Sequence, residues 1–365
     1  DELAHFNYAA ILAQTGMRPV QVSDGPSSLP LDQYHFEYYQ SPLYYYLAAG
    51  TLRILPLGFN PLTGLRLLNL LIGILLLVLI IRSVGLIGKE FAEPAGVLTA
   101  ALGSAVLFSV TVTNDTLFWL DAGLVFFYGL SLLQKPSLVN RLGLTFSLML
   151  AIWAKMSALT LLPAVLFAHF IAGGGAGAVK RAVSAAGWTL IAIVGAVPLF
   201  LQNAAFYGTP IPMEVGLGAD TGWQQFSLHN IYLALNYILH TFYFPFENYY
   251  RGGFQAMIFL LVGLGTLAVV LFAGQYILRR YRQGDAVFRQ WTWFILLLLA
   301  GNLGGLAMMV VRYHQSEARL AFGALPAIVF ILAAGALEAE KRWKIPASDM
   351  LFILAGLPYL LFIVY

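Results

Sequence analysis

The chain has no cysteine and few charged residues. Without cysteine it can form neither a disulfide nor a thiolate metal site. Of its 365 residues, 10% are charged and 60% are apolar, whereas a typical soluble domain has about 25% charged residues. This composition excludes an ordinary soluble domain and indicates a protein that crosses a membrane several times.

Sequence motifs for nucleotides and metals are also missing. Neither a P-loop nor a GxGxxG motif occurs, which argues against a nucleotide donor. No HxxxH or HExxH spacing occurs, so a metal site has no support from local spacing, although separate loops could build one. The net charge of +3 is small, and the basic residues are sorted by membrane side and form no continuous stripe, so we expect no nucleic-acid partner.

Apolar runs divided by polar or Gly- and Pro-containing turns predict ten membrane helices. A helix needs about 20 residues to cross the hydrocarbon core, and backbone groups in lipid must be satisfied within the segment. The expected fold class is therefore an all-α, polytopic membrane protein. Because the chain opens on a polar loop without an initiator Met, we also expect one further membrane helix upstream. The predicted spans are about 62–84, 94–112, 116–133, 140–153, 157–172, 182–201, 254–278, 291–311, 320–337 and 351–365.

Loop charge decides how residues 140–172 are divided. This stretch can form one over-long helix or two short helices that meet near Lys155. Two helices place most basic residues on one side, whereas one helix erases the asymmetry. The positive-inside rule therefore favours two helices and places Asp1 on the extracytoplasmic face of the cell membrane. The basic residues assigned to the inside are Arg82, Lys89, Lys135, Arg141, Lys180, Arg181, Arg279, Arg280, Arg282, Arg289, Lys341, Arg342 and Lys344.

We treat residues 1–365 as a single membrane domain with two long outer loops, 1–61 and 202–253. The first loop opens on a predicted amphipathic helix, which Gly16 and Pro19 end. Such a helix is expected to lie along the membrane surface. Its apolar stripe is formed by Leu3, Phe6, Ala10 and Ala13.

Asp1, Glu2 and His5 form the first candidate group. Asp1 and His5 are four residues apart on a helix, so their side chains face the same way and can act on one substrate. The alternative is a solvated helix start, where acids are favoured by the helix dipole.

Asn114 and Asp115 form a second group at an outer turn. The alternative is an ordinary N-cap, for which both residue types are preferred. Asp121 follows six residues later, about 9 Å further along a helix. An acid at that depth must face a polar cavity or a partner, and a structural pair with Lys155 is the other interpretation.

Lys155, Arg312 and Arg319 form a cationic group, with His314 and Glu317 nearby in the sequence. Basic side chains at outer helix ends are exceptions to the positive-inside rule. They suit a phosphate presented from the outer leaflet. Alternatively, such side chains reach the lipid headgroups by snorkelling.

Short motifs in these places follow one another in a definite order along most of the chain. They are Asp1-Glu2, Gln40-Ser41-Pro42-Leu43-Tyr44-Tyr45, Leu65-Arg66-Leu67-Leu68-Asn69, Asn114-Asp115, Ala154-Lys155-Met156-Ser157, Tyr207-Gly208-Thr209-Pro210 and Glu317-Ala318-Arg319. In order and context the series resembles the GT-C superfamily of polyprenyl-phosphate-dependent glycosyltransferases, in particular the group of protein O-mannosyltransferases and aminoarabinose lipid A transferases. Gln40-Ser41-Pro42 stands where many members have His-Pro-Pro.

The resemblance implies a GT-C-like fold and the transfer of a sugar, with inversion, from a polyprenyl-phosphate donor to an acceptor hydroxyl. It implies that Asp1 activates the acceptor, that Asp115 binds the acceptor or, in some members, a divalent cation, and that Lys155 and Arg319 hold the lipid phosphate. The acceptor can be a glycan, a lipid or a protein. The predicted catalytic residues are Asp1, Glu2 and Asp115; the predicted substrate-binding residues are His5, Asn114, Asp121, Lys155, Arg312, Glu317 and Arg319.

Two other classes of function stay open at this point. A transporter or lipid-linked-sugar flippase would place polar groups near the middle of the membrane, where Asp121 is the clear candidate. A non-catalytic scaffold would use the aromatic outer loops to bind a partner.

Overall fold

The computed structural model describes residues 2–20, 37–212, 227–243, 253–313, 315 and 317–363. Within these ranges the chain forms helices and no strand, which confirms the all-α class. Asp1, His314 and parts of both predicted outer loops lie outside the described residues.

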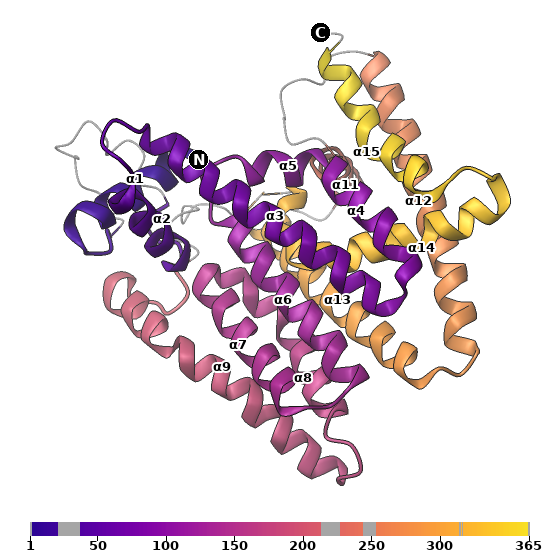
Figure 1. Cartoon of the computed structure of the whole chain (residues 1–365), viewed down its shortest axis with the longest axis horizontal. Coiled ribbons are helices and arrows are strands. Elements are labelled where there is room, and N and C mark those ends of the chain that lie inside the picture. The colour runs from indigo at the N-terminus through magenta and orange to yellow at the C-terminus, as the bar shows by residue number, and fades with distance from the viewer. Residues whose placement is uncertain are drawn as a thin grey trace.

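Figure 1 shows the arrangement of the helices, which follow one another along the chain. The α-helices of the first half are α1 (Glu2–Thr15), α2 (Leu43–Ile54), α3 (Pro61–Ile87), α4 (Ala92–Ala101), α5 (Gly103–Ser109), α6 (Asp115–Gln134), α7 (Leu138–Ala154) and α8 (Leu162–Ile171). Those of the second half are α9 (Ala178–Tyr207), α11 (Leu228–Tyr243), α12 (Gly253–Arg282), α13 (Ala286–Tyr313), α14 (Leu325–Trp343) and α15 (Ala347–Ile363). Short 3₁₀ helices are η2 (Lys89–Phe91), η3 (Met156–Leu161) and η5 (Ala318–Ala324).

Six helices in the described chain are long and apolar enough to cross a membrane. They are Pro61–Ile87, Asp115–Gln134, Ala178–Tyr207, Met257–Arg282, Ala286–Arg312 and Ala318–Trp343. Three shorter apolar helices, Leu138–Ala154, Met156–Ile171 and Ala347–Tyr359, coincide with three further predicted spans. The total number of membrane crossings stays a prediction.

The predicted span 94–112 is bent in the structure. The structure has two helices there, Lys89–Ala101 and Gly103–Ser109, bent by 65° at Leu102. Leu102 takes an extended conformation, which interrupts the helical hydrogen bonding. By contrast, the predicted division of 140–172 is confirmed, because Lys155 is extended and separates α7 from η3.

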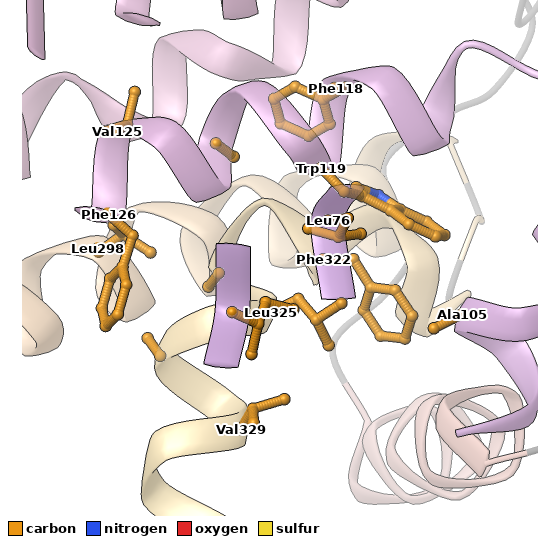
Figure 2. Close-up of a cluster of buried hydrophobic side chains, with 14 of the residues drawn as sticks. Leu76, Ala105, Phe118, Trp119, Val125, Phe126, Leu298, Phe322, Leu325 and Val329 are labelled. Carbon is orange, nitrogen blue, oxygen red and sulfur yellow. The ribbon is translucent and has the colours of Figure 1, made fainter. Parts of the chain in front are cut away.

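The core of the bundle is built around α6 and the unit of η5 and α14. In the most apolar windows of these two spans, 72% and 78% of residues are buried, against 28–33% in the other four long spans. Figure 2 shows Trp119 of α6 beside Phe322 of η5, whose rings meet edge to face at 4.9 Å. Gly323 lets η5 lie close to α13 and α6, because a Cβ there would overlap Asn302 of α13 and Phe118 of α6.

The connections bring three chain segments to one end of the bundle. Helices α6 and α7 are consecutive and packed together, so the start of α6 at Asp115 and the end of α7 before Lys155 lie at the same end. η5 packs against α6 and η3 and brings Arg319 there. The opposite end carries basic residues that the sequence assigned to the inside, such as Arg279 and Lys341, both paired with Glu338.

Helix α1 packs on α2 through a polar and aromatic face. His5 and Tyr8 are buried against Tyr45, and the Tyr8 and Tyr45 rings stack with centroids 3.6 Å apart. Of the predicted apolar stripe, Leu3 is 46% exposed, whereas Phe6 and Ala13 are partly buried and pack against the hydrophobic core.

The crossing of α12 and α14 provides a test of the packing. A Cβ on Gly335 of α14 would overlap the backbone carbonyl of Val269 of α12. We expect Gly335→Ala to force the two helices apart and to cost about 1–3 kcal/mol of stability, measured as a lower thermal unfolding midpoint of the purified protein in detergent. Gly274→Ala on α12 is the matched control, because nothing lies within 4 Å of its added Cβ. Equal midpoints for the two variants would contradict the described crossing.

Candidate active site

The site is organised around one buried carboxylate that contacts two cations. The Asp115 side chain is 3% exposed and forms ion pairs with Lys155 through Oδ1 and with Arg319 through Oδ2, the latter at 3.3 Å. Arg319 also pairs with Glu317, and its guanidinium lies 5.0 Å from the centroid of the Phe108 ring. The structure therefore brings together four residues that the sequence analysis had selected.

Local backbone structure explains why these side chains converge. The N–H of Asp115 donates to Oγ1 of Thr113 at 3.2 Å. Asn69 of α3 donates to the carbonyl oxygen of Thr113 at 3.1 Å, which fixes the turn before α6. Lys155 is the extended residue between α7 and η3, and its Nζ donates to Asp115 at the start of α6.

Asn114 stands at the N-cap position of α6, but its side chain makes no capping hydrogen bond. Its Nδ2 instead donates to the carbonyl oxygen of Ala154 and to Oε1 of Gln40, both at 3.3 Å. Asn114 thus links the start of α6 to the residue before Lys155 and to Gln40 of the first predicted outer loop.

Glu37 is an acidic residue of this site that our sequence predictions did not include. Its carboxylate accepts a hydrogen bond from Nε2 of Gln40 at 2.9 Å. Burial raises the pKa of Glu37, although Gln40 and the charges of Lys155 and Arg319 act in the opposite direction. The acid stands next to the Gln40 motif, yet no local spacing connects it with residues 115, 155 and 319.

Arg18 holds the turn that carries Glu37. This arginine is buried, and it donates to the side chains of Gln202 and Asn203 of α9 at 3.0 and 2.9 Å. It also donates to the backbone carbonyl oxygens of Tyr39 and Gln40 at 3.3 and 3.1 Å. The turn at residues 37–40 is thereby attached to the end of α9, far along the sequence.

His5 lies beside the ionic cluster as a neutral imidazole. Its Nδ1 is 2.6 Å from the hydroxyl of Tyr45, and the ring is 3% exposed. Burial lowers the pKa of His5 to about 3; Asp115 opposes this shift, while Lys155 and Arg319 reinforce it.

Glu2 has both carboxylate oxygens engaged at the head of α1. Arg66 of α3 donates to them at 2.9 and 2.5 Å, and the N–H of Val112 donates at 2.9 Å. Burial raises the pKa of Glu2, but these bonds outweigh it and hold that pKa below its ordinary value. This contact attaches α1 to α3 and to the turn before α6. Asp1, the neighbouring candidate, lies outside the described residues.

Arg312 and Asp121 are the two remaining candidates. Arg312 is partly buried in the last turn of α13. Asp121 is 3% exposed within α6, and its Oδ2 has no hydrogen-bond partner in the described part of the chain. The suggested pair of Asp121 with Lys155 is wrong, because Lys155 binds Asp115.

The described residues do not fit a divalent-cation site. Among them, no three His, Asp or Glu side chains come close enough to hold an ion. The two oxygens of Asp115 each contact a cationic side chain, which would compete with a metal ion.

Removal of the central carboxylate tests the arrangement. Asp115→Ala leaves Lys155 and Arg319 without their shared partner, and breaking a buried ion pair costs about 3–5 kcal/mol. We expect a lower thermal unfolding midpoint in detergent. Asp349→Ala is the control, because this acid stands in the first turn of α15 on the predicted inner side. The same midpoint for Asp115→Ala and the wild type would contradict the described ion pairs.

Comparison with known proteins identifies the fold. No family model matches the chain, and no curated protein matches its sequence. The structure is similar to the crystal structure of ArnT from Cupriavidus metallidurans in the apo state, with a TM-score of 0.58 and 15% sequence identity over 92% of this chain and 55% of that chain. The present chain thus spans about half the length of that protein. The similarity shows that this polytopic membrane protein has a GT-C-like fold.

Proposed function

We propose that the protein is a membrane glycosyltransferase that moves a sugar from a polyprenyl-phosphate-linked donor to an acceptor hydroxyl on the extracytoplasmic face, with inversion. One observation carries this proposal: Lys155 and Arg319, from separate segments, meet at Asp115 at one end of a GT-C-like bundle. The acceptor is a glycan, a lipid or a protein, and the donor lies in the membrane lipid.

The two cations suit the phosphate of such a donor. Arginine presents several N–H donors in one plane and lysine a compact charge, and both bind phosphate oxygens through charge-assisted hydrogen bonds. Their side chains are 17% and 19% exposed, so they can be reached and are still largely shielded from water. Asp115 and Glu317 hold them in place before a donor arrives.

The transfer needs a base on one side of the sugar and stabilised negative charge on the other. The acceptor oxygen attacks the anomeric carbon as the bond from that carbon to the phosphate oxygen breaks, and the electron pair passes to the phosphate. Lys155 and Arg319 stabilise the phosphate charge. Asp1 is proposed to receive the acceptor proton. No step uses a metal ion.

The other selected residues are proposed to shape the substrate site. Glu2 fixes the helix that starts next to Asp1, and His5 and Asn114 line the surroundings of the ionic cluster. Glu317 orients Arg319. Arg312 and Asp121 are proposed to contact the donor or acceptor further from the reacting carbon.

Transport of a lipid-linked sugar is a second candidate function, favoured by Asp121. A buried carboxyl oxygen without a hydrogen-bond partner in the described structure is costly within a membrane and often marks a transport pathway. The two functions differ in their product, because transport moves the substrate without forming a new covalent bond.

The donor site is tested with labelled polyprenyl-phosphate sugars and the purified protein in lipid vesicles. We expect Lys155→Met and Arg319→Met each to reduce covalent sugar transfer on the order of 100-fold, since each removes a charge that stabilises the leaving phosphate. Arg342→Met is the matched control, because Arg342 is exposed and contacts Gln275 near the predicted inner end. Full transfer by the Lys155 variant would contradict the proposal.

The proposed base is tested separately with Asp1→Asn. This change removes the proton acceptor and keeps a similar side-chain size, so we expect covalent transfer to fall by about 100-fold or more, while the labelled donor still binds. A variant that transfers sugar at the wild-type rate would exclude Asp1 as the base. Movement of the labelled lipid across the vesicle membrane with no covalent product would favour the transporter.

A further inference from the structure

Three described carboxylates lie within electrostatic reach of the cation pair, and they differ in their partners. Asp115 pairs with both cations, and Glu317 pairs with Arg319. Glu37 has no ion pair in the described structure, and its side chain accepts its hydrogen bond from the neutral amide of Gln40. Glu37 is therefore the carboxylate of this group that is not already committed to a charged partner.

A chain of amide hydrogen bonds places Glu37 relative to the cations. Gln40 donates to Glu37 through Nε2 at 2.9 Å and accepts through Oε1 from Asn114 at 3.3 Å. Asn114 precedes Asp115 and also donates to the carbonyl oxygen of Ala154, the residue before Lys155. Arg18 donates to the backbone carbonyl oxygen of Gln40 and so holds the turn that carries Glu37. Glu37 is therefore fixed next to the site by contacts on both sides.

Charged and titratable groups from several elements face Glu37. Lys155 and Arg319 favour its ionised form, whereas Asp115 of α6 opposes it. The hydroxyls of Tyr39, in the same turn, and of Tyr45, in α2, are neutral groups that also lie within its electrostatic influence. Burial acts against ionisation, and before a donor binds the two cations partly offset that effect.

A bound phosphate would remove the effect by which the two cations favour the ionised form of Glu37. Its negative charge would neutralise the two cations that favour ionised Glu37, and it would add a repulsive charge of the same sign. Both effects favour a proton on the carboxyl group. A protonated carboxylic acid can then donate a hydrogen bond to a phosphate oxygen.

On this basis, and resting on the proposed function, we propose that Glu37 is a catalytic acid that takes up a proton when the donor phosphate binds between Lys155 and Arg319. As the bond from the anomeric carbon to the phosphate oxygen breaks, its electron pair remains on that oxygen, and the Glu37 proton moves to the phosphate. The acceptor proton goes to the base on the other side of the sugar. Glu37 ends the step as a carboxylate and regains a proton from solvent when the next donor binds.

Proton uptake on binding tests this role directly, without a catalytic assay. The probe is farnesyl methyl phosphate, a lipid phosphodiester whose own phosphate does not titrate near neutral pH. Its binding to the full chain in detergent is measured by calorimetry in buffers of different ionisation enthalpy. We expect wild-type binding to take up a fraction of one proton at pH 7, and its affinity to fall by as much as tenfold for each unit of rising pH between the pKa of Glu37 in the free protein and its higher pKa in the bound state.

Glu37→Gln is expected to bind the diester without proton uptake and with an affinity independent of pH, because glutamine can still donate a hydrogen bond but cannot titrate. Glu93→Gln, an exposed acid at the start of α4, is the matched control and should retain wild-type uptake.

The outcomes separate this inference from the proposed function. Diester binding that depends on Lys155 but takes up no proton in the wild type would overturn the role of Glu37 and leave the proposed function standing. Uptake that persists in Glu37→Gln would also overturn it. If the diester does not bind the wild type at all, the proposed donor site fails and the inference fails with it. The proton uptake of the wild-type protein on binding the diester tests the proposal even if Glu37→Gln does not fold.

Discussion

The ion pairs of Asp115 with Lys155 and Arg319 are the interaction on which the described site depends. They join residues that are 40 and 204 positions apart in the chain, at the start of α6, at the junction of α7 and η3, and in η5. A single buried carboxylate would be costly, and so would two buried cations, but together they offset much of one another's desolvation. The hydrogen bonds among Asn114, Gln40 and Glu37 extend from the start of α6, where Asp115 forms these ion pairs.

The bundle supports this ionic group with an apolar core directly behind it. Trp119 and Phe118 of α6 pack against η5, which carries both Phe322 and Arg319, so the same contacts that bury the aromatic rings also set the position of the guanidinium. An anionic ligand at this place would meet two cations that are already held in position, and little reorganisation would be needed. That physical property is the reason for assigning a lipid phosphate to the site.

Some features of the fold could be predicted from local sequence patterns, whereas others depend on contacts with residues distant in the sequence. The break near Lys155 followed from charge asymmetry, because a one-helix alternative would have scattered the basic residues over both sides. The bend at Leu102 left no comparable trace, since apolar residues continue through it. Asn114 has the residue type and position of an N-cap, but its side chain donates hydrogen bonds to Oε1 of Gln40 and to the carbonyl oxygen of Ala154 instead.

The sequence by itself determined the membrane character, the all-α class and the residue types that could bind a phosphate, because composition and apolar run length act locally along the chain. It also pointed to Asp115, Lys155 and Arg319 as separate candidates. Only the tertiary structure decided that these three meet, that Arg66 pairs with Glu2, and that Gln40 links Glu37 to Asn114. Those outcomes depend on which helix ends lie side by side, and no local spacing encodes a contact across 204 residues.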